Sequence, residues 1–372
     1  MLIPYLILLF MYVIFGALSN SVNMQKSVNR KNNILFLSLC GLCLVLFIGL
    51  RGTYVGDDTV WYKYYFFQQT DHEFFDFSSY TSSHFEIGYR IITKLIILFT
   101  HNEQIYLLIV AAISVYLWMK AISLLSPEKP FNTLLYGTLL IQSSFYFYMN
   151  VIRQGIACGI LALALYQLFN KKYIRYFVLV LVAATFHSFA LLFIPLIALE
   201  KVNITRRNYI KTNIIVLISL SIFSRIAKIV TERFFPRYVY YFATDYNSQQ
   251  RIGPRAILLL LVGVFLIAMN YQILKYNEDN NKRRIAFYYG VISTLGTVLL
   301  FNMQNFGILE RCARYFNYYY MFSLTFVLVN LKKRTYLQIY RVLILCALMA
   351  FYIYNLATNY NGLTPYTLFF LE

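Results

Sequence analysis

Charged residues are scarce in this chain, and acidic residues are scarcer than basic ones. Of the 372 residues, 13% are charged, whereas soluble domains carry about 25%. Hydrophobic residues make up 60% of the chain, and the mean hydropathy is +0.58. A water-soluble fold cannot bury this much apolar surface, so the composition excludes an ordinary soluble domain and predicts an integral membrane protein.

Cysteine is also rare, since the chain has 5 cysteines. Cys40 and Cys43 form a C-x-x-C motif, but they lie inside an apolar run without a second cluster of cysteine or histidine. Redox and structural zinc sites of this kind need partners that the sequence does not offer. We therefore interpret these cysteines as small packing residues and predict neither a metal site nor a cofactor.

Short alternating strands are missing, and long apolar runs take their place. Residues 34–50, 104–125 and 256–274 approach the roughly 20 apolar residues that cross a hydrocarbon core. They are apolar on every face, as helices in lipid must be, and unlike barrel strands. Residues 2–18 lack a basic leader and a cleavage site, so we expect the first span there. The prediction is an all-α polytopic bundle of about 10 to 12 spans with re-entrant or short helices, forming a single membrane domain over residues 1–372.

The formal charge of +18 does not indicate a partner nucleic acid, because the basic residues stand in short clusters between apolar runs. Such clusters are typical of cytoplasmic loops. We place residues 26–31, 171–175, 201–211 and 332–334 in the cytoplasm. The polar loops at about residues 51–85 and 231–255 then fall outside, and the first of them holds Asp57, Asp58, Asp71, Glu73 and Asp76.

Two segments conflict with a simple alternation of spans. Four apolar segments lie between the first outer loop and the second basic cluster, where an odd number of crossings is needed. The shortest, residues 87–100, contains Arg90 and Lys94, so we expect a re-entrant or interfacial helix. In residues 173–199, a break near His187 keeps the next basic cluster inside. Two short helices would enter from the cytoplasm and meet at His187, which requires protein or water around the break.

Ionisable residues within or beside apolar runs are costly and are therefore candidates for function. Arg153 begins an apolar helix, with Gln154 beside it and Gly155 and Gly159 in the next turn. A guanidinium and a helix N-terminus together favour a bound anion. The simpler alternative is an arginine that reaches to lipid headgroups.

A second pair of cations lies near the start of a later span. Arg311 and Arg314 share one face if their segment is helical, and both would then hold one diphosphate. Glu310 is the neighbouring acid, and its simpler role is to neutralise one of the two arginines.

Three residues compete as a general base. His187 stands among apolar residues, where it either moves a proton near neutral pH or packs as a hydrogen-bonded core residue. Glu86 opens the short segment at residues 87–100. Asp58 follows Gly56 and Asp57, and such a pair of acids is also common in turns.

Several of these residues stand in short motifs that follow one another along nearly the whole chain: Arg51 with Gly56-x-Asp58 and Tyr62, Phe85-Glu86-x-Gly88-Tyr89, Arg153-Gln154, Ala184-x-x-His187-Ser188, and Pro365-Tyr366 before Phe369-Phe370. Their order and spacing resemble the EpsG-like family of Wzy-type polysaccharide polymerases. The family usually has a less charged residue where Asp57 stands, so we map the acid of the motif to Asp58.

The resemblance implies a multi-pass protein of the bacterial inner membrane, similar in fold to the GT-C-like lipid-dependent glycosyltransferases. It would build O-antigen, capsule or exopolysaccharide with its active site toward the outside. Donor and acceptor would both be oligosaccharides on undecaprenyl diphosphate, and the transfer would invert the anomeric carbon. Further implied partners are membrane lipids, a flippase and a chain-length regulator.

This reaction needs cationic charge on the departing diphosphate, which arginines supply without a metal. The residues that we predict for diphosphate binding are Arg153, Gln154, Arg311, Arg314 and Arg51. The predicted catalytic residues are His187, Glu86 and Asp58, of which we favour His187 or Glu86 as the base. The aromatic rings suited to stacking on sugars are Trp61, Tyr62, Tyr89 and Tyr366.

Other classes of protein compete with this interpretation. A lipid-linked oligosaccharide flippase or transporter also needs buried cations, but it predicts internal symmetry, and no duplicated halves are visible. A membrane O-acyltransferase would use an intramembrane histidine, but it leaves the outer arginines unexplained. A purely structural role for the polar residues does not explain why so many of them are predicted on one side.

Overall fold

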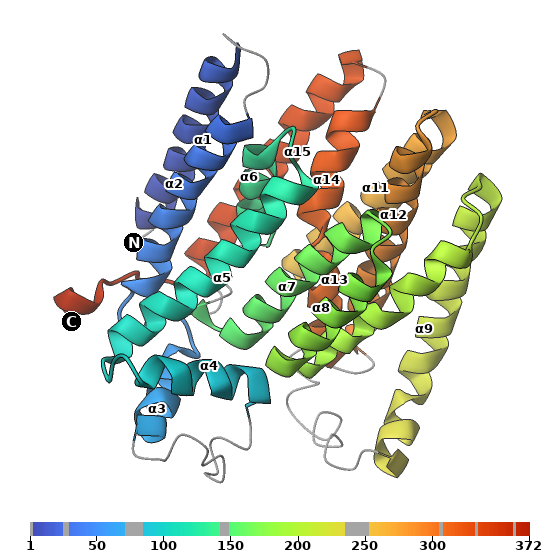
Figure 1. Ribbon diagram of the computed structural model, residues 1–372. Helices are drawn as coiled ribbons and strands as arrows, with labels where there is room; N and C mark the ends of the chain where they lie inside the picture. The colour runs from blue at the N-terminus through green and yellow to red at the C-terminus, as the bar shows by residue number, and fades with distance from the viewer. Residues whose placement is uncertain are drawn as a thin grey trace. The chain divides into compact units, whose positions relative to one another are not determined.

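The computed structural model describes residues 3–24, 30–70, 85–141, 149–234, 253–304, 308–331, 334–359 and 362–372. Within these ranges the regular elements are helices, apart from an isolated antiparallel bridge between Arg51 and Leu368 (Figure 1). The predicted all-α polytopic bundle is therefore confirmed. The helices form two compact units, Met1–Ile194 with Ile344–Glu372, and Pro195–Leu343, which are described separately.

By length and composition, four of the described helices are able to cross a membrane: α5 (Glu103–Leu125), α7 (Ile152–Phe169), α11 (Pro254–Tyr276) and α12 (Asn280–Phe301). At 1.5 Å per residue, helices of this length extend about 27 to 35 Å, which matches a hydrocarbon core. Shorter apolar helical stretches cover Ile3–Ser19, Asn33–Gly49, Tyr173–Phe186 and Arg341–Ala357. These stretches fall on spans or short helices that the apolar runs predicted.

The first unit is a bundle of helices around α5. It contains α1 (Ile3–Met24), α2 (Arg30–Gly49), α6 (Pro130–Ile141), α7, α8 (Tyr173–Phe186) and the C-terminal part of α15 (Arg334–Ala357). Helix α5 packs against α2 on one side and α7 on the other, and α7 packs against α8. The C-terminal segment, which includes the short helix η7 (Phe369–Leu371), lies against α1 and α2. The Tyr5 hydroxyl donates to the Leu363 carbonyl and the Tyr366 hydroxyl to the Phe47 carbonyl.

Two short helices occupy the region that the sequence assigned to an outer loop and an interfacial segment. Helix α3 (Thr59–Thr70) lies within the predicted loop, of which residues 71–84 lie outside the described ranges. Helix α4 (Ile87–Ile97) has 11 residues, so it extends about 16 Å and is too short to cross. Figure 1 shows α4 lying across the long helices of its unit. The prediction that this segment is not a span is confirmed.

The predicted break at His187 is present. Helix α8 ends at Phe186, the His187 backbone is extended (φ −159°, ψ 118°), and the 3₁₀ helix η3 (Ser188–Lys201) begins at the next residue. The Tyr176 hydroxyl of α8 donates to the Phe193 carbonyl of η3. Because Tyr176 precedes the break and Phe193 follows it, the chain turns back on itself at His187.

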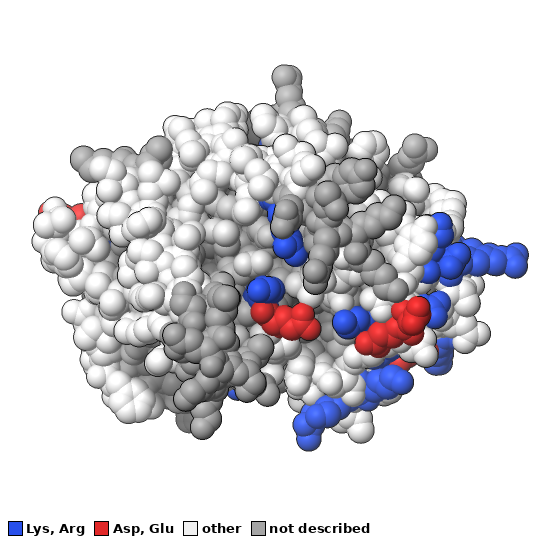
Figure 2. All heavy atoms as spheres, turned by 90° about the horizontal axis from the view of Figure 1, so that it is seen from above, with Lys and Arg blue, Asp and Glu red and all other residues white. Residues whose placement is uncertain are grey.

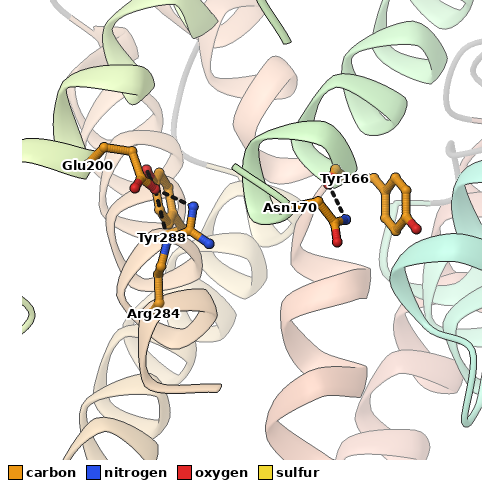
Figure 3. A network of polar contacts seen from close by, with 5 residues as sticks. All are labelled: Tyr166, Asn170, Glu200, Arg284 and Tyr288. Atoms are coloured by element: carbon orange, nitrogen blue, oxygen red, sulfur yellow. Dashed lines mark hydrogen bonds and ion pairs between the residues drawn. The ribbon is translucent and has the colours of Figure 1, made fainter. Parts of the chain in front are cut away.

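Helix α7 ends where the sequence places a basic cluster. The Asn170 side-chain nitrogen donates to the Tyr166 carbonyl at 2.7 Å (Figure 3), and Lys171 takes a positive φ of 58°. The Asn170 side chain thus donates a hydrogen bond to one of the last carbonyls of the helix. Lys171, in the left-handed conformation, ends the helix.

The second unit packs around α12. It contains α9 (Arg206–Phe234), α11, α12, the short η5 (Asn302–Gln304), α13 (Ile308–Asn317) and α14 (Tyr320–Asn330). Arg206 Nη2 donates to the Lys275 carbonyl at 3.1 Å, and Arg283 Nη2 to the Ile204 carbonyl at 3.4 Å. These contacts bring the start of α9 and the turn between α11 and α12 to one end of the unit, as the alternating topology predicts.

An ion pair anchors this end of the second unit. Glu200 Oε1 accepts from Arg284 Nε at 2.8 Å and from the Tyr288 hydroxyl at 2.7 Å (Figure 3). Figure 2 shows the molecule from above, with several separate Lys and Arg side chains on this face and fewer Asp and Glu between them. Glu200 is thus committed to Arg284 and does not neutralise the basic cluster that follows it.

A turn divides the apolar segment at residues 315–331. Helix α13 ends at Asn317 and α14 begins at Tyr320. At this point the Tyr319 amide bonds to the Phe316 carbonyl and the Phe322 amide to the Tyr319 carbonyl, both at 3.1 Å. These hydrogen bonds join residues three apart and interrupt the α-helical bonds between residues four apart. The helix that follows the turn, α14, has 11 residues.

Candidate functional site

Glu86 connects the predicted motifs of the first unit. It occupies the position before α4 with an extended backbone (φ −67°, ψ 151°). Its Oε2 forms an ion pair with Arg153 Nη1, and its Oε1 accepts from the Ser188 amide at 3.4 Å. Residues from three distant segments, preceding α4, opening α7 and following the His187 break, therefore meet at one carboxylate.

Arg153 lies in the first turn of α7 above an aromatic ring. Its guanidinium carbon is 4.5 Å from the centre of the Phe85 ring, and the Tyr62 hydroxyl also hydrogen bonds with it. The side chains of Arg153 and Glu86 are each 24% exposed, so the ion pair can be reached from outside. Arg153 is also the second residue of α7, and the N-terminus of a helix favours an anion.

Gln154 lies differently from Arg153. Its side chain is 3% exposed, because the next position of α7 faces the helix bundle. The predicted pairing of Arg153 and Gln154 around one anion is therefore not supported by their placement, and Arg153 alone faces the site.

Aromatic rings form the base of the site. Phe85 stacks on Tyr65 at 4.1 Å between ring centres and on Tyr89 at 5.6 Å, and Tyr62 meets Phe85 edge-on at 6.0 Å. The Tyr89 hydroxyl lies 2.5 Å from that of Tyr106. Burial raises the pKa of the Tyr62 hydroxyl, although Arg153 acts in the opposite direction. Tyr62 therefore remains a neutral hydrogen-bonding group.

Glycine at position 88 permits the close approach of α4 to α8. A Cβ atom there would lie 2.8 Å from the Thr185 carbonyl oxygen and would also meet the Thr185 hydroxyl. Thr185 stands two residues before His187, so this contact sets the distance between Glu86 and the break. The Gly88 of the FEIGY motif is thus explained by backbone packing at the site.

We expect Gly88→Ala to destabilise the protein by about 1 to 3 kcal/mol, because the added methyl group overlaps a backbone atom of α8. The same displacement separates Glu86 from the Ser188 amide and lowers activity. The thermal midpoint of the purified protein and its activity measure both effects. Gly253→Ala is the matched control, because a Cβ there meets nothing within 4 Å. An unchanged midpoint for Gly88→Ala would contradict the packing argument.

His187 occupies the turn itself. Its amide donates to the Ala183 carbonyl at 3.1 Å and its carbonyl accepts from the Ala190 amide at 3.0 Å. The side chain is half-buried, with its ring 5.5 Å from that of Phe189. Since the adjacent Ser188 amide binds Glu86, the predicted base lies next to the Arg153 ion pair.

Arg51 has a different environment from the one predicted. Its side chain is 1% exposed and donates to the Thr59 hydroxyl at 3.0 Å and to the Ile48 and Met149 carbonyls at 2.5 and 3.2 Å. A guanidinium enclosed in this way holds the protein together and presents no face to a substrate. The placement does not support the predicted diphosphate role, and we assign none to Arg51.

The four predicted sugar-stacking residues differ in how exposed they are. Trp61 is 67% exposed on α3, and its ring is available. Tyr62 and Tyr89 are buried in the aromatic base, and Tyr366 stacks on Phe47 at 4.4 Å. Of the four predicted rings, Trp61 is therefore the most exposed, and the other three pack against residues of the protein.

Asp58 stands at the start of α3 and is half-buried, with its carbonyl accepting from the Tyr62 amide at 3.1 Å. Sequence reasoning named Phe85 only as part of a motif and did not single out Tyr65, whose ring stacks on the Phe85 ring beneath Arg153. The signal for Tyr65 is its spacing of three residues from Tyr62 along α3, which places the two rings on one face.

The second unit contains the other predicted cations. Residues 308–317 are helical, as the shared face of Arg311 and Arg314 requires, and Arg314 Nη2 pairs with Glu310 Oε1 at 2.7 Å. Burial alone would raise the pKa of Glu310, but Arg314, Arg255 and Arg311 outweigh it and hold that pKa below its usual value. The prediction that Glu310 neutralises one arginine is confirmed, and the cluster keeps a net positive charge.

Comparison with known proteins gives a match to one family model. The model of the EpsG family matches residues 34–368. The matched region contains the predicted site residues, the whole of the second unit and most of the first. No curated protein and no solved structure matches the chain significantly.

Proposed function

The chain belongs to the EpsG family, and from this premise we propose that it joins undecaprenyl-diphosphate-linked repeat units into polysaccharide by inverting glycosyl transfer. Family membership and apolar helices support a polysaccharide-polymerase-like role in a bacterial membrane. We propose that the membrane is the inner membrane and that the site faces outward. The product would be an O-antigen, a capsule or an exopolysaccharide.

The observation that carries this proposal is the meeting of Arg153, Glu86 and the His187 turn in the first unit. Transfer from a lipid diphosphate needs a cation beside the departing phosphate and a proton acceptor beside the attacking hydroxyl. A guanidinium at a helix N-terminus, next to a histidine in a helix break, supplies both. Residues that only anchor helices would need neither a cation beside a phosphate nor a proton acceptor beside a hydroxyl.

In the proposed reaction, the hydroxyl oxygen of the acceptor sugar attacks the anomeric carbon of the donor. The bond from this carbon to the diphosphate oxygen breaks, and the diphosphate leaves with the bonding electrons. The proton of the hydroxyl passes to His187, and the increasing negative charge on the diphosphate is stabilised by Arg153. Attack opposite the leaving group inverts the configuration at the anomeric carbon.

We favour His187 over Glu86 and Asp58 as the base. Both oxygens of Glu86 are already engaged, one by Arg153 and one by the Ser188 amide. A carboxylate committed in this way orients its two partners. Glu86 is therefore proposed as a positioning residue that holds Arg153 and the His187 turn. Trp61 is proposed to contact a sugar of the substrate.

The second unit has its own candidate for an anionic group. Polymerisation uses two lipid-linked molecules, a donor and an acceptor, and each carries a diphosphate. Arg311, with Arg255 and Arg314 around Glu310, supplies more cationic than anionic charge. We propose that Arg311 and Arg314 bind one lipid-linked diphosphate, and that a flippase and a chain-length regulator act with the protein in the membrane.

Polymer growth from purified components tests the proposal. Protein in proteoliposomes is supplied with undecaprenyl-diphosphate-linked repeat unit, and products are separated by size. Wild type is expected to give a ladder, and His187→Gln to lower its rate by about 10² to 10⁴-fold. Ser188→Ala, which keeps the amide that Glu86 binds, is the control and retains the ladder. Transport of the substrate without a ladder would favour a flippase, and an unchanged ladder for His187→Gln would exclude this base.

A further inference from the structure

An apolar groove lies in the second unit between α9, α11 and α12. Its volume is about 490 Å³, and its walls include Ile214 and Leu217 of α9, Val264 and Ala268 of α11, and Val298 of α12. This volume is in the range of ligand pockets, about 300 to 1,000 Å³. The groove belongs to neither of the cation sites described above.

Three of the polar side chains that line the groove form hydrogen bonds within the protein. Thr294 Oγ1 donates to Asn213 Oδ1 at 2.5 Å, and Asn213 Nδ2 donates to the Tyr209 carbonyl at 2.8 Å. The Tyr209 hydroxyl donates to the Ile267 carbonyl at 2.7 Å. With these hydrogen bonds made internally, the groove presents mainly apolar atoms and suits a hydrocarbon chain.

At one end of the groove, basic residues lie on α9 and α11 just beyond the residues that line it. On α9, Arg206 and Arg207 lie one helical turn before Tyr209 and Ile210, and Lys211 follows directly; all three cations are exposed. On α11, Lys275 lies one turn after Tyr271 and Gln272. The contact of Arg206 with the Lys275 carbonyl brings these two wall ends together.

The acids nearby are fewer than these four cations. Glu200 is held by Arg284 and Tyr288, and Asp279 caps α12 by accepting from the Asn281 amide at 2.8 Å. Glu278 is exposed in the turn. Arg206 uses one guanidinium nitrogen for Lys275, and a guanidinium has five N–H donors, so others are available to an anion.

We propose that this groove binds an anionic phospholipid of the cytoplasmic leaflet, with an acyl chain between α9 and α11 and the phosphate at the basic end. The basic end belongs to segments that the charge pattern predicts to be cytoplasmic, and basic pockets between helices on that side are suited to anionic headgroups. A polyprenyl diphosphate undergoing transfer would have its diphosphate at the other face. The bound lipid fills the space beside α9 and stabilises the second unit.

Native mass spectrometry of the delipidated full chain tests this site with dioleoyl phosphatidylglycerol and dioleoyl phosphatidylcholine as probes. Wild type is expected to retain the anionic lipid in preference to the zwitterionic one. Arg207→Gln with Lys211→Gln is expected to weaken retention on the order of 20-fold, because each cation near a headgroup contributes about 5-fold. Lys171→Gln with Lys172→Gln, an exposed pair in the first unit, removes the same charge and leaves retention unchanged.

A second variant tests the apolar part. Ala268→Trp fills the groove and is expected to lower retention of phosphatidylglycerol, whereas Leu261→Trp, on an exposed α11 position outside the lining, is its control. Phosphatidylglycerol is also expected to raise the thermal midpoint of wild type more than that of Ala268→Trp. Equal retention of both probes, equal losses in both charge variants, or preference for undecaprenyl phosphate over phosphatidylglycerol would overturn the proposal.

Discussion

Replacement of Arg153 by alanine is expected to lower the rate of polymer growth by about 10² to 10³-fold, the range found when a preorganised donor to a developing anion is removed. The guanidinium lies at the N-terminus of α7, where the helix dipole adds to its charge. Arg153→Lys keeps the charge but loses the planar fork, so a smaller loss of about 10-fold is expected. The rate of ladder growth in proteoliposomes, at matched protein content, is the measurement.

Arg153 also pairs with Glu86, so its removal leaves a carboxylate without this partner. The double variant Glu86→Gln with Arg153→Gln separates the two effects, because it removes both charges together. If Arg153 binds diphosphate, the double variant stays as inactive as Arg153→Gln. Recovery of activity in the double variant would show that Arg153 serves only to neutralise Glu86. Arg175→Ala, at an exposed position of α8, is the control for the loss of one arginine.

Arg51→Met is expected to lower the free energy of unfolding by about 3 kcal/mol, because buried acceptors lose a charged donor. Methionine has a similar length, so the change removes the charge and the hydrogen bonds while leaving little empty space. Three partners are affected: the Thr59 hydroxyl at the start of α3, the Ile48 carbonyl of α2 and the Met149 carbonyl before α7. Loss of these bonds releases the loop that carries Asp58 and α3.

The thermal midpoint of the purified variant in one detergent measures this effect, with Arg175→Met as the exposed control. A normal midpoint together with lost polymerisation would instead favour the substrate-binding role that the sequence suggested for Arg51. A lowered midpoint with activity per folded molecule retained would support the structural role.

Some features followed from the sequence because they depend on local composition or on charge. The break at His187 followed from the need to keep the basic residues 201–211 on the cytoplasmic side. The short helix α4 followed from its length and its two cations. Both arguments use only the cost of charge in lipid and the thickness of a bilayer. Neither argument requires knowledge of which helices touch.

Other features depend on packing between distant segments and did not follow. Arg153 and Glu86 are 67 residues apart, and their predicted roles gave no reason to pair them. Arg51 follows α2 in sequence, and only the folded chain shows its guanidinium turning back to the Ile48 carbonyl. The turn between α13 and α14 lies in an aromatic run whose composition fits a continuous span equally well.

The order of the two units along the chain has a consequence for biogenesis. The first unit consists of two stretches of the chain, Met1–Ile194 and Ile344–Glu372. The second unit, Pro195–Leu343, lies between these two stretches in the sequence. The Tyr5 hydroxyl of α1 binds the Leu363 carbonyl, and the Arg51 backbone forms a bridge with Leu368. Helices α1 and α2 are therefore synthesised before residues 363–368, which they contact, and the second unit is made in between. The Gly52 and Gly56 amides donate to the Thr367 and Gly362 carbonyls in the folded chain, so these hydrogen bonds form late in assembly.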